Sequence, residues 1–288
     1  MDTNALHAFL AVAESGSFSL ASEQLFLTQP AVSKRIAALE DELATRLFER
    51  LGRRVLLTES GRTLLPKARH ILREMADSRR LIADLATGVS GTLQLATSHH
   101  IGLHRLPTIL RDYSHRYPEV AFDLRFMDSE QGCEAVAAGD VEMAVVTLPQ
   151  LPTARLVLRK VWDDPLAVMV RKTHPLAEGR KEAGDLVAYP AIVPEKGTET
   201  RRLIEGVFEA AGVKLRVGVA TNYLETIRML VAAGLGWSVL PLSMLDDELV
   251  CVDLPDLRLH RELGIVTRET GHLSRAAQAF CDLLIPAS

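Results

Sequence analysis

Apolar positions near the start of the chain recur at the spacing of three short helices. In the first helix, which is expected to end at residues 15–16, the residues at positions i, i+3, i+4 and i+7 are Leu6, Phe9, Leu10 and Ala13. A second helix is predicted over residues 19–25, and a tight turn over residues 26–28. A third helix opens at Gln29-Pro30, where proline breaks no intrahelical hydrogen bond. Three short helices joined by so tight a turn predict a helix-turn-helix.

The third predicted helix has two contrasting faces. At 100° per residue, one side gathers Val32, Ile36, Leu39 and Leu43. The opposite side is small, polar and basic, and gathers Pro30, Ser33, Lys34 and Ala37. Such a face fits the major groove of DNA, where glutamine pairs with adenine and lysine reaches guanine or phosphate. An ordinary amphipathic helix with a solvated outer face is the alternative. The expected DNA contacts on this helix are Thr28, Gln29, Pro30, Ser33 and Lys34.

A basic segment follows the three helices. Residues 46–69 hold seven arginines and lysines against two glutamates, although the whole chain has a formal net charge of −4. Gly52 permits a turn before the extended residues 55–57, and this pattern predicts a small β-wing. Arg53 and Arg54 at its tip are expected in the narrow minor groove, and Arg50 on a phosphate. Residues 1–58 are therefore predicted to form a winged helix-turn-helix that binds double-stranded DNA.

A long helix is predicted next, over residues 59–87. Its apolar seam has heptad spacing with Ser78 as a polar interruption, and consists of Leu64, Ala68, Ile71, Met75, Ile82 and Leu85. Pro66 is expected to bend or restart the helix. A helix of this length exceeds what its own domain can cover, so the seam predicts a dimer arm. Packing on the C-terminal domain is the alternative. Residues 87–91 are expected to form a hinge.

Residues 91–288 alternate between short apolar strands and helices, which predicts an α/β domain with a parallel sheet. The order of the elements fits two lobes, approximately residues 91–160 with 266–288, and residues 161–265. The chain is expected to cross between the lobes near residues 147–156 and again at Asn222 or beyond. The fold class is α/β overall, with a mainly α N-terminal domain.

Small polar residues follow several of the predicted strands. In α/β folds, ligands bind beyond the carboxyl ends of strands, where helix N-termini favour anions. The residues expected to bind a small anion, such as a carboxylate, are Thr97, Ser98, His99, His100, Asp128, Thr147, Thr198 and Asn222. For each hydroxyl, a helix cap is the alternative role. Since adjacent side chains at a helix start diverge, His99 and His100 are not expected to share a metal ion, and one of them is expected to face the ligand.

Several classes of protein fit the sequence poorly. Three widely spaced cysteines offer no zinc motif and suit a reducing compartment, and neither Cys133 nor Cys281 has a partner nearby in sequence for redox sensing. The longest uncharged stretch, residues 229–245, is too short and too interrupted to span a membrane. No signal peptide is evident, so we expect a cytoplasmic protein and not a secreted binding protein. Residues 236–238 resemble half of a nucleophile elbow, but Leu240 replaces the second glycine. No enzyme and no cofactor is therefore expected.

Two stretches together resemble the LysR-type transcriptional regulators: SLASEQLFLTQPAVSKRIAALE at residues 19–40 and LATRLFERLGRRVLLTESG at residues 43–61. The chain departs from the family pattern at Lys34-Arg35 in place of Arg-Gln, at Ala44 in place of glycine and at Ser60 in place of alanine. The resemblance implies a homodimer or homotetramer that binds DNA, with a small-molecule effector in a domain like the periplasmic binding proteins. Contact with RNA polymerase is compatible with this role.

Overall fold

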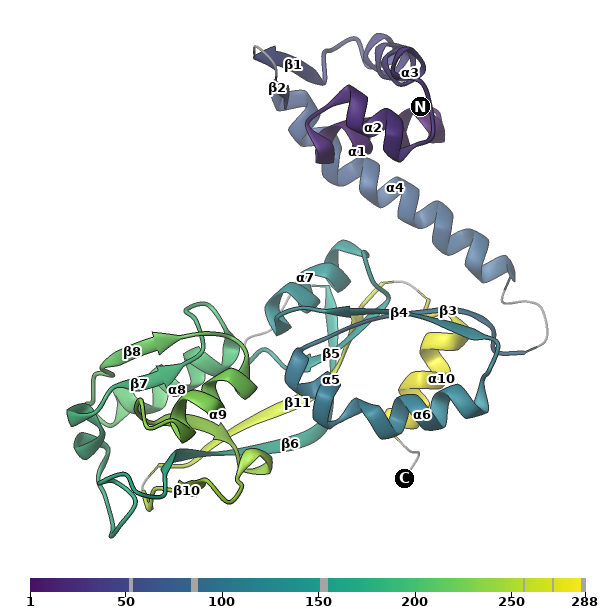
Figure 1. Ribbon diagram of the computed structural model, residues 1–288. Helices are drawn as coiled ribbons and strands as arrows, with labels where there is room; N and C mark the ends of the chain where they lie inside the picture. The colour runs from purple at the N-terminus through teal and green to yellow at the C-terminus, as the bar shows by residue number, and fades with distance from the viewer. Residues whose placement is uncertain (52–53, 84–87, 151–154, 256, 271, 286–288) are drawn as a thin grey trace. The chain divides into compact units, whose positions relative to one another are not determined.

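The computed structural model describes residues 1–288 except 52–53, 84–87, 151–154, 256, 271 and 286–288 (Figure 1). The chain divides into two compact units, Met1–Ala86 and Thr87–Ser288. Each unit has its own hydrophobic core, and each is described by itself below.

The N-terminal unit is a winged helix-turn-helix followed by a long helix. Its elements are α1 (Thr3–Ser15), α2 (Phe18–Gln24), α3 (Gln29–Glu42), β1 (Phe48–Leu51), β2 (Arg54–Leu57) and α4 (Glu59–Ala83). Local signals set the helix boundaries: the side chains of Asp2, Ser17 and Thr28 cap α1, α2 and α3. Gly16 ends α1 with a φ of 61°, a left-handed conformation that glycine adopts without strain. The predicted three helices and wing are confirmed.

The apolar face of α3 is shorter than predicted. Val32, Ile36 and Leu39 are buried against the other helices. Leu43 is 36% exposed, because α3 ends at Glu42 and Leu43 is the residue that caps it. The prediction was wrong for Leu43 because the helical periodicity was extended one residue past the end of the helix.

The seam of α4 divides into two parts. Leu64, Ala68 and Ile71 pack against the core of the N-terminal unit, and Ala68 has no exposed surface. The prediction that the seam lacks a partner in its own domain is wrong for this half, because α4 contacts α1. Further along, Met75 and Ile82 are exposed, and Ser78 donates a hydrogen bond to the Glu74 carbonyl of its own helix. Leu85 lies outside the described residues. Since α4 is continuous through Pro66, no restart occurs there.

The C-terminal unit consists of two α/β lobes. Lobe I contains β3 (Gly91–Thr97), α5 (His99–His104), α6 (Leu106–Arg116), β4 (Val120–Phe126), α7 (Ser129–Ala138), β5 (Met143–Thr147) and α10 (Arg275–Leu284). Lobe II contains β7 (Ala191–Val193), α8 (Glu199–Ala210), β8 (Val217–Ala220), α9 (Leu224–Ala232), β9 (Ser238–Pro241) and β10 (Leu249–Cys251). Short 3₁₀ helices occupy Ala183–Ala188 and Leu242–Met244. Each lobe encloses an apolar core, around Tyr113 and Phe280 in lobe I and around Phe208 and Trp237 in lobe II.

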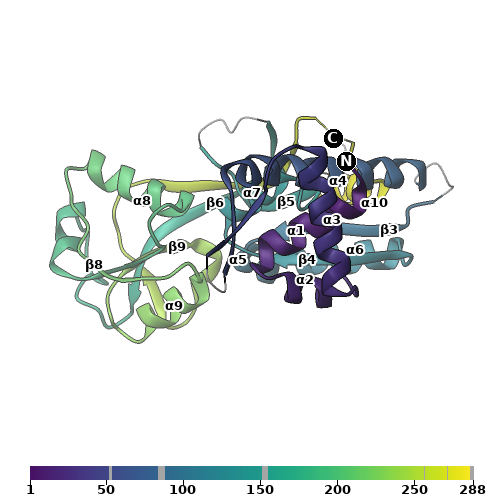
Figure 2. The same cartoon turned by 90° about the horizontal axis from the view of Figure 1, so that it is seen from above.

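Two long antiparallel strands connect the lobes. They are β6 (Leu156–Arg171) and β11 (Leu259–Arg268), which run from one lobe to the other in both Figure 1 and Figure 2. One end of the pair continues into lobe I, where β11 pairs with β5, and the other end continues into lobe II, where β6 pairs with β9 and β10. The second crossing is therefore β11, which lies beyond Asn222 and agrees with the prediction of a crossing at Asn222 or beyond. Residue 222 lies inside lobe II, between β8 and α9.

The sheet is mixed, whereas the sequence predicted a parallel one. Within this sheet the pairs β3–β4 and β3–β5 are parallel, and so is the separate two-stranded sheet of β7 and β8, as the alternation of strands and helices indicated. Pairings that involve β6 or β11 are antiparallel. Since β6 leads into lobe II and β11 returns from it, the two strands run in opposite directions and pair in the antiparallel register.

Candidate functional site

The outer face of α3 carries the residues expected to contact DNA. The structure leaves Thr28, Gln29, Pro30 and Lys34 exposed and Ser33 half-buried. Thr28 also caps the helix, since its hydroxyl accepts a hydrogen bond from the backbone N–H of Ala31 at 3.4 Å. Gln29 Nε2 donates to Ser33 Oγ at 3.2 Å, so these two polar side chains lie together on this face.

Hydrogen bonds fix the start of the wing relative to α3. The Glu40 carboxylate accepts from the backbone N–H groups of Leu47 and Phe48, at 2.7 and 3.2 Å. Thr58 Oγ1 closes the other side by donating to the Arg46 carbonyl at 2.7 Å and accepting from the Gly61 N–H at 3.0 Å. These contacts of Glu40 and Thr58 join the end of α3, the start of β1 and the start of α4.

The arginines of the wing are only partly within the described structure. The backbones of Arg50 and Arg54 belong to β1 and β2, whose register pairs Arg50 with Val55 and Leu51 with Arg54. Arg53 lies outside the described residues. The strands therefore agree with the predicted wing, and the contacts of its three arginines with DNA stay a prediction.

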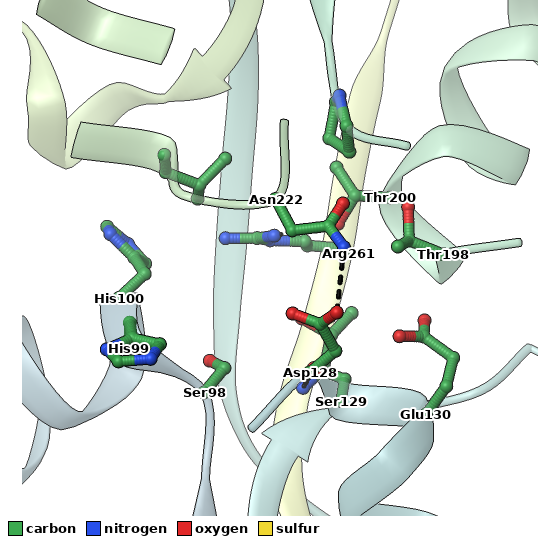
Figure 3. Close-up of a pocket in the computed structure, with 13 residues that line it drawn as sticks. Ser98, His99, His100, Asp128, Ser129, Glu130, Thr198, Thr200, Asn222 and Arg261 are labelled. Carbon is green, nitrogen blue, oxygen red and sulfur yellow. Dashed lines mark hydrogen bonds between the residues drawn. The ribbon is translucent and has the colours of Figure 1, made fainter. Parts of the chain in front are cut away.

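A small cavity of about 50 Å³ lies between the two lobes of the C-terminal unit (Figure 3). Its lining residues are Ser98, His99, His100, Asp128, Ser129, Glu130, Thr147, Pro194, Thr198, Thr200, Asn222, Leu224 and Arg261. This volume holds about four water molecules or a small anion. Seven of the eight residues expected to bind an effector line this cavity, although they come from distant parts of the chain.

Thr97 is the exception. Its side chain is 1% exposed and its hydroxyl donates to the Val145 carbonyl at 2.8 Å, inside the sheet of lobe I. Side chains alternate between the faces of a strand, so the residue that ends β3 points into the sheet while Ser98 reaches the cavity. The prediction that Thr97 contacts an effector was wrong for this reason.

Two predicted residues bridge the lobes. Asn222 Nδ2 from lobe II donates to Asp128 Oδ2 from lobe I at 2.7 Å, the contact that is dashed in Figure 3. The amide oxygen of Asn222 also accepts from the backbone N–H of Glu195 at 2.9 Å, which fixes its orientation.

Thr198 plays the alternative role named for the hydroxyls, because it caps α8 by accepting from the Arg201 N–H at 3.2 Å.

Glu130 contributes a second contact between the lobes. It lies in the first turn of α7 in lobe I, and its carboxylate accepts a hydrogen bond from the backbone N–H of Glu199, the first residue of α8 in lobe II. The positive end of the α8 dipole therefore faces a carboxylate of the protein itself. Sequence reasoning did not select Glu130, because an acidic residue in the first turn of a helix is common for helix stability alone.

Arg261 is the main lining residue that sequence reasoning missed. It is 7% exposed, its Nε donates to Asp164 Oδ2 and its Nη1 donates to Thr200 Oγ1, both at 2.8 Å. Arg105 donates to the other oxygen of Asp164 at 3.1 Å, so two guanidinium groups share one carboxylate. A signal was available: along β11 the inward positions 259, 261 and 263 are Leu, Arg and Leu. An arginine that points inward between two leucines marks a buried charge with a specific task.

Both histidines at the start of α5 line the cavity, whereas only one was expected to face it. The His99 ring lies against the rings of Tyr223 and Phe126, with centroids 5.0 and 5.4 Å apart. His100 is buried, and its Nδ1 lies 3.3 Å from Glu225 Oε1. Burial and the nearby charge of Arg261 lower the pKa of His100 below its ordinary value, despite the contact with Glu225.

Ser238, the residue that resembled half of a nucleophile elbow, lies within β9 and is fully buried. A nucleophile elbow requires a sharp turn that exposes the serine, so this position has the wrong geometry for one. Among the described helices, none combines the length and the apolar character that a membrane span requires.

The winged unit and the two-lobed unit each match a family model. Residues 3–62 match the bacterial regulatory helix-turn-helix proteins of the lysR family, and residues 86–287 match the LysR substrate binding domain. The chain belongs to the LysR family. LysR-family proteins are transcriptional regulators, so the chain is a DNA-binding transcriptional regulator with an effector-binding domain.

Individual LysR relatives extend over nearly the whole chain. The HTH-type transcriptional activator CmpR of Synechocystis sp. is 31% identical over 282 residues, which cover 96% of this chain and 92% of CmpR. Full-length CbnR in complex with its target DNA has the same fold, with a TM-score of 0.71 at 22% identity over 99% of both chains. The regulatory domain of Synechocystis CcmR in complex with 2-PG is 27% identical, with a TM-score of 0.62, over 68% of this chain and 96% of that domain.

Proposed function

We propose that this LysR regulator responds to a small anion bound in the cavity between its lobes, where Arg261 supplies the positive charge. The observation that carries the proposal is the arrangement of two arginines around a single carboxylate. Arg261 and Arg105 both bond to Asp164, which leaves one positive charge uncompensated within this group, and Arg261 lines the cavity. A buried uncompensated charge is costly unless an opposite charge accompanies it.

The other lining groups suit the same ligand. Ser98, Ser129, Thr147, Thr198 and Thr200 bring hydroxyls to the cavity, and the N-termini of α7 and α8 open onto it. Hydroxyls and helix N-termini stabilise oxyanions by hydrogen bonds and by the helix dipole. The complex of the related CcmR regulatory domain with 2-PG adds support from a relative.

An anion at this place would act on the contacts that join the lobes. Glu130 occupies the N-terminus of α8, and Asn222 holds Asp128, so an incoming anion competes with two carboxylates of the protein. Exchange of these contacts changes how the lobes lie against each other, which is the conformational change that we propose for the response. The cavity acts in binding and carries out no catalysis.

The remaining parts of the proposal concern DNA and assembly. The exposed face of α3 reads the major groove through Gln29 and Lys34, and the wing arginines hold the backbone and minor groove. The exposed second half of the α4 seam, with Met75 and Ile82, suits pairing with a second copy in a homodimer or homotetramer. A regulator of this kind acts in the cytoplasm, where it meets the chromosome and RNA polymerase.

A binding screen with the full-length protein tests the effector claim. Small carboxylates, phosphate esters and 2-PG are added one at a time, and the thermal transition and the heat of binding are measured. We expect at least one anion to bind at one site per chain. Ser98→Ala removes a cavity hydroxyl that makes no capping hydrogen bond to α5, and is expected to weaken this binding several-fold. Ser114→Ala on the exposed surface of α6 is the matched control. The proposal fails if no anion binds, or if Ser98→Ala binds the anion as tightly as the wild type and the Ser114→Ala control do.

A further inference from the structure

A second cluster of polar side chains lies beside the cavity and joins the same two lobes. His100 and His104 are one turn apart on α5 of lobe I, so they share a face of the helix, with ring centroids 4.7 Å apart. Glu225, in the first turn of α9 in lobe II, places Oε1 3.3 Å from His100 Nδ1 and 3.0 Å from His104 Nε2. One potential ligand atom from each residue lies within 4.8 Å of the other two.

We propose that His100, His104 and Glu225 form a site for a zinc-type divalent cation that links lobe I to lobe II. Two imidazoles and one carboxylate are a donor set that Zn²⁺ and its neighbours in the first transition series prefer. The remaining coordination position is taken by water. The cluster shares His100 with the lining of the cavity, but it uses neither Arg261 nor the cavity hydroxyls, and the inference holds whether or not an anion is the effector.

The spacing of the donor atoms fits a metal site. Ligand atoms that lie about 2.0–2.1 Å from zinc at tetrahedral angles are separated by about 3.4 Å. The two nitrogen-to-oxygen distances of 3.0 and 3.3 Å are close to this value, so a cation needs only small side-chain movements to enter. The i, i+4 arrangement of the two histidines on one helix also presents both rings to the same point without backbone change.

The second observation is an orphaned nitrogen on His100. This side chain is 96% buried, and among the described residues its Nε2 has no hydrogen-bond partner. Because no protein group fixes the tautomer from that side, the proton can reside on Nε2 and leave the Nδ1 lone pair for a cation. A histidine kept only for packing gains nothing from a buried polar atom without a partner.

The charges around the cluster are compatible with a divalent cation. With neutral imidazoles the cluster carries the single negative charge of Glu225, and a cation of charge two turns this into a net positive charge of one. Arg261 is the neighbouring basic group that acts on His100, and its guanidinium is bonded to the Asp164 carboxylate. The negative charge of Asp164 therefore offsets the positive charge of Arg261 and reduces the repulsion between this arginine and a bound cation.

Bound metal would fasten the lobes together. His100 and His104 belong to lobe I, and Glu225 belongs to lobe II, so the cation adds a bond across the same boundary that Asn222 and Glu130 span. Binding energy that depends on one relative position of the lobes shifts the population towards that position. The site therefore gives the protein a second input, a cation, beside its effector.

The test uses the tag-free full-length protein after removal of metals with a chelator. Zn²⁺ is titrated in competition with a chromophoric chelator, and Co²⁺ is added as a spectroscopic probe of the ligands. We expect one tightly bound Zn²⁺ per chain, and a visible Co²⁺ spectrum of nitrogen and oxygen ligands without a sulfur charge-transfer band. His104→Ala and Glu225→Gln, both on partly exposed side chains, are expected to weaken binding at least about tenfold with an unchanged thermal transition of the metal-free protein.

The matched control is His115→Ala, which removes an exposed histidine from the neighbouring helix α6. We expect this variant to bind Zn²⁺ like the wild type. The proposal is overturned if Zn²⁺ does not bind at one per chain, if binding survives in both His104→Ala and Glu225→Gln, or if a sulfur charge-transfer band shows that a cysteine holds the ion.

Discussion

The carboxylate of Glu130 lies at the N-terminus of α8 and accepts the backbone N–H of Glu199 from the opposite lobe. A group of the protein thus occupies one of the positions that an oxyanion prefers. The negative charge of Glu130 both stabilises the contact between the lobes and opposes the entry of an anionic effector. The affinity for an effector therefore depends on what is displaced as well as on what is formed.

Glu130→Gln separates these two effects, because glutamine keeps an oxygen that accepts the hydrogen bond and removes the charge. We expect the affinity for the effector anion to rise about two- to fivefold, the size of one charge near a helix terminus. Calorimetric titration of wild type and variant measures the change. Glu134→Gln, on the exposed side of the same helix, is the control and is expected to leave the affinity unchanged. A weaker binding in Glu130→Gln would show that the carboxylate helps to hold the ligand.

Lys34→Ala tests the face of α3. Lys34 is exposed on the side of the helix opposite to the buried Ile36. We expect the loss of about 1–3 kcal/mol of binding free energy on a specific site and a much smaller loss on unrelated DNA, if the lysine contacts a base. Lys67→Ala, which removes another exposed lysine, on α4, is the control. Titration of labelled DNA at several salt concentrations distinguishes a base contact from a phosphate contact, which would lower the salt slope by about one.

Gly61→Ala tests the junction of wing and long helix. A Cβ at Gly61 would lie 2.2 Å from the carbonyl oxygen of Leu47, which is backbone and has little freedom to move. We expect a loss of about 1–3 kcal/mol of stability in the N-terminal unit, the usual cost of overpacking, together with weaker DNA binding. The neighbouring Ser60→Ala removes only a hydroxyl contact with Thr45 and is expected to cost less. Thermal unfolding followed by circular dichroism compares the two, and equal effects would contradict the close packing of Gly61.

The cysteines are predicted to react slowly in the folded protein. Burial raises the pKa of both Cys133 and Cys281 to about 11, so at pH 8 their thiolate fraction is about a hundredfold or more below that of a free cysteine. Because the pKa is raised, the rate of alkylation should increase about tenfold per pH unit between pH 8 and pH 10. Iodoacetamide labelling followed by mass spectrometry measures these rates, with the urea-unfolded chain as control. Rapid labelling of the native protein at pH 7 would favour a redox role for these thiols.

The parts of the fold that the sequence predicted are those set by neighbouring residues. The apolar spacing of α1 and α3, the glycine after α1, the proline at the start of α3 and the alternation in β4 are local signals, and they predicted the helices of the N-terminal unit and most elements of lobe I. The resemblance to the LysR family then supplied the arrangement of two lobes, which the family models confirm.

The parts that the sequence did not predict depend on residues that are far apart along the chain. The β6–β11 pair joins strands about a hundred positions apart, and no residue pattern within either strand identifies the other as its antiparallel partner. His104 was not selected, because its partner Glu225 is 121 residues away. Thr97 was placed at the cavity because periodicity indicates alternation without saying which face points inwards, and only the packing of the strand decides this.

DNA binding in the presence of the effector is the most direct test of the central claim that an anion near Arg261 regulates this protein. Fluorescence anisotropy of labelled DNA from its own upstream region is measured with the full-length protein, with and without the anion that binds most tightly. We predict that the anion changes the affinity of the wild type for DNA or the number of subunits bound to the DNA. Arg261→Gln leaves Arg105 to pair with Asp164, and we predict that this variant binds DNA without responding to the anion. An unchanged response in Arg261→Gln, or no response in the wild type, would contradict the account.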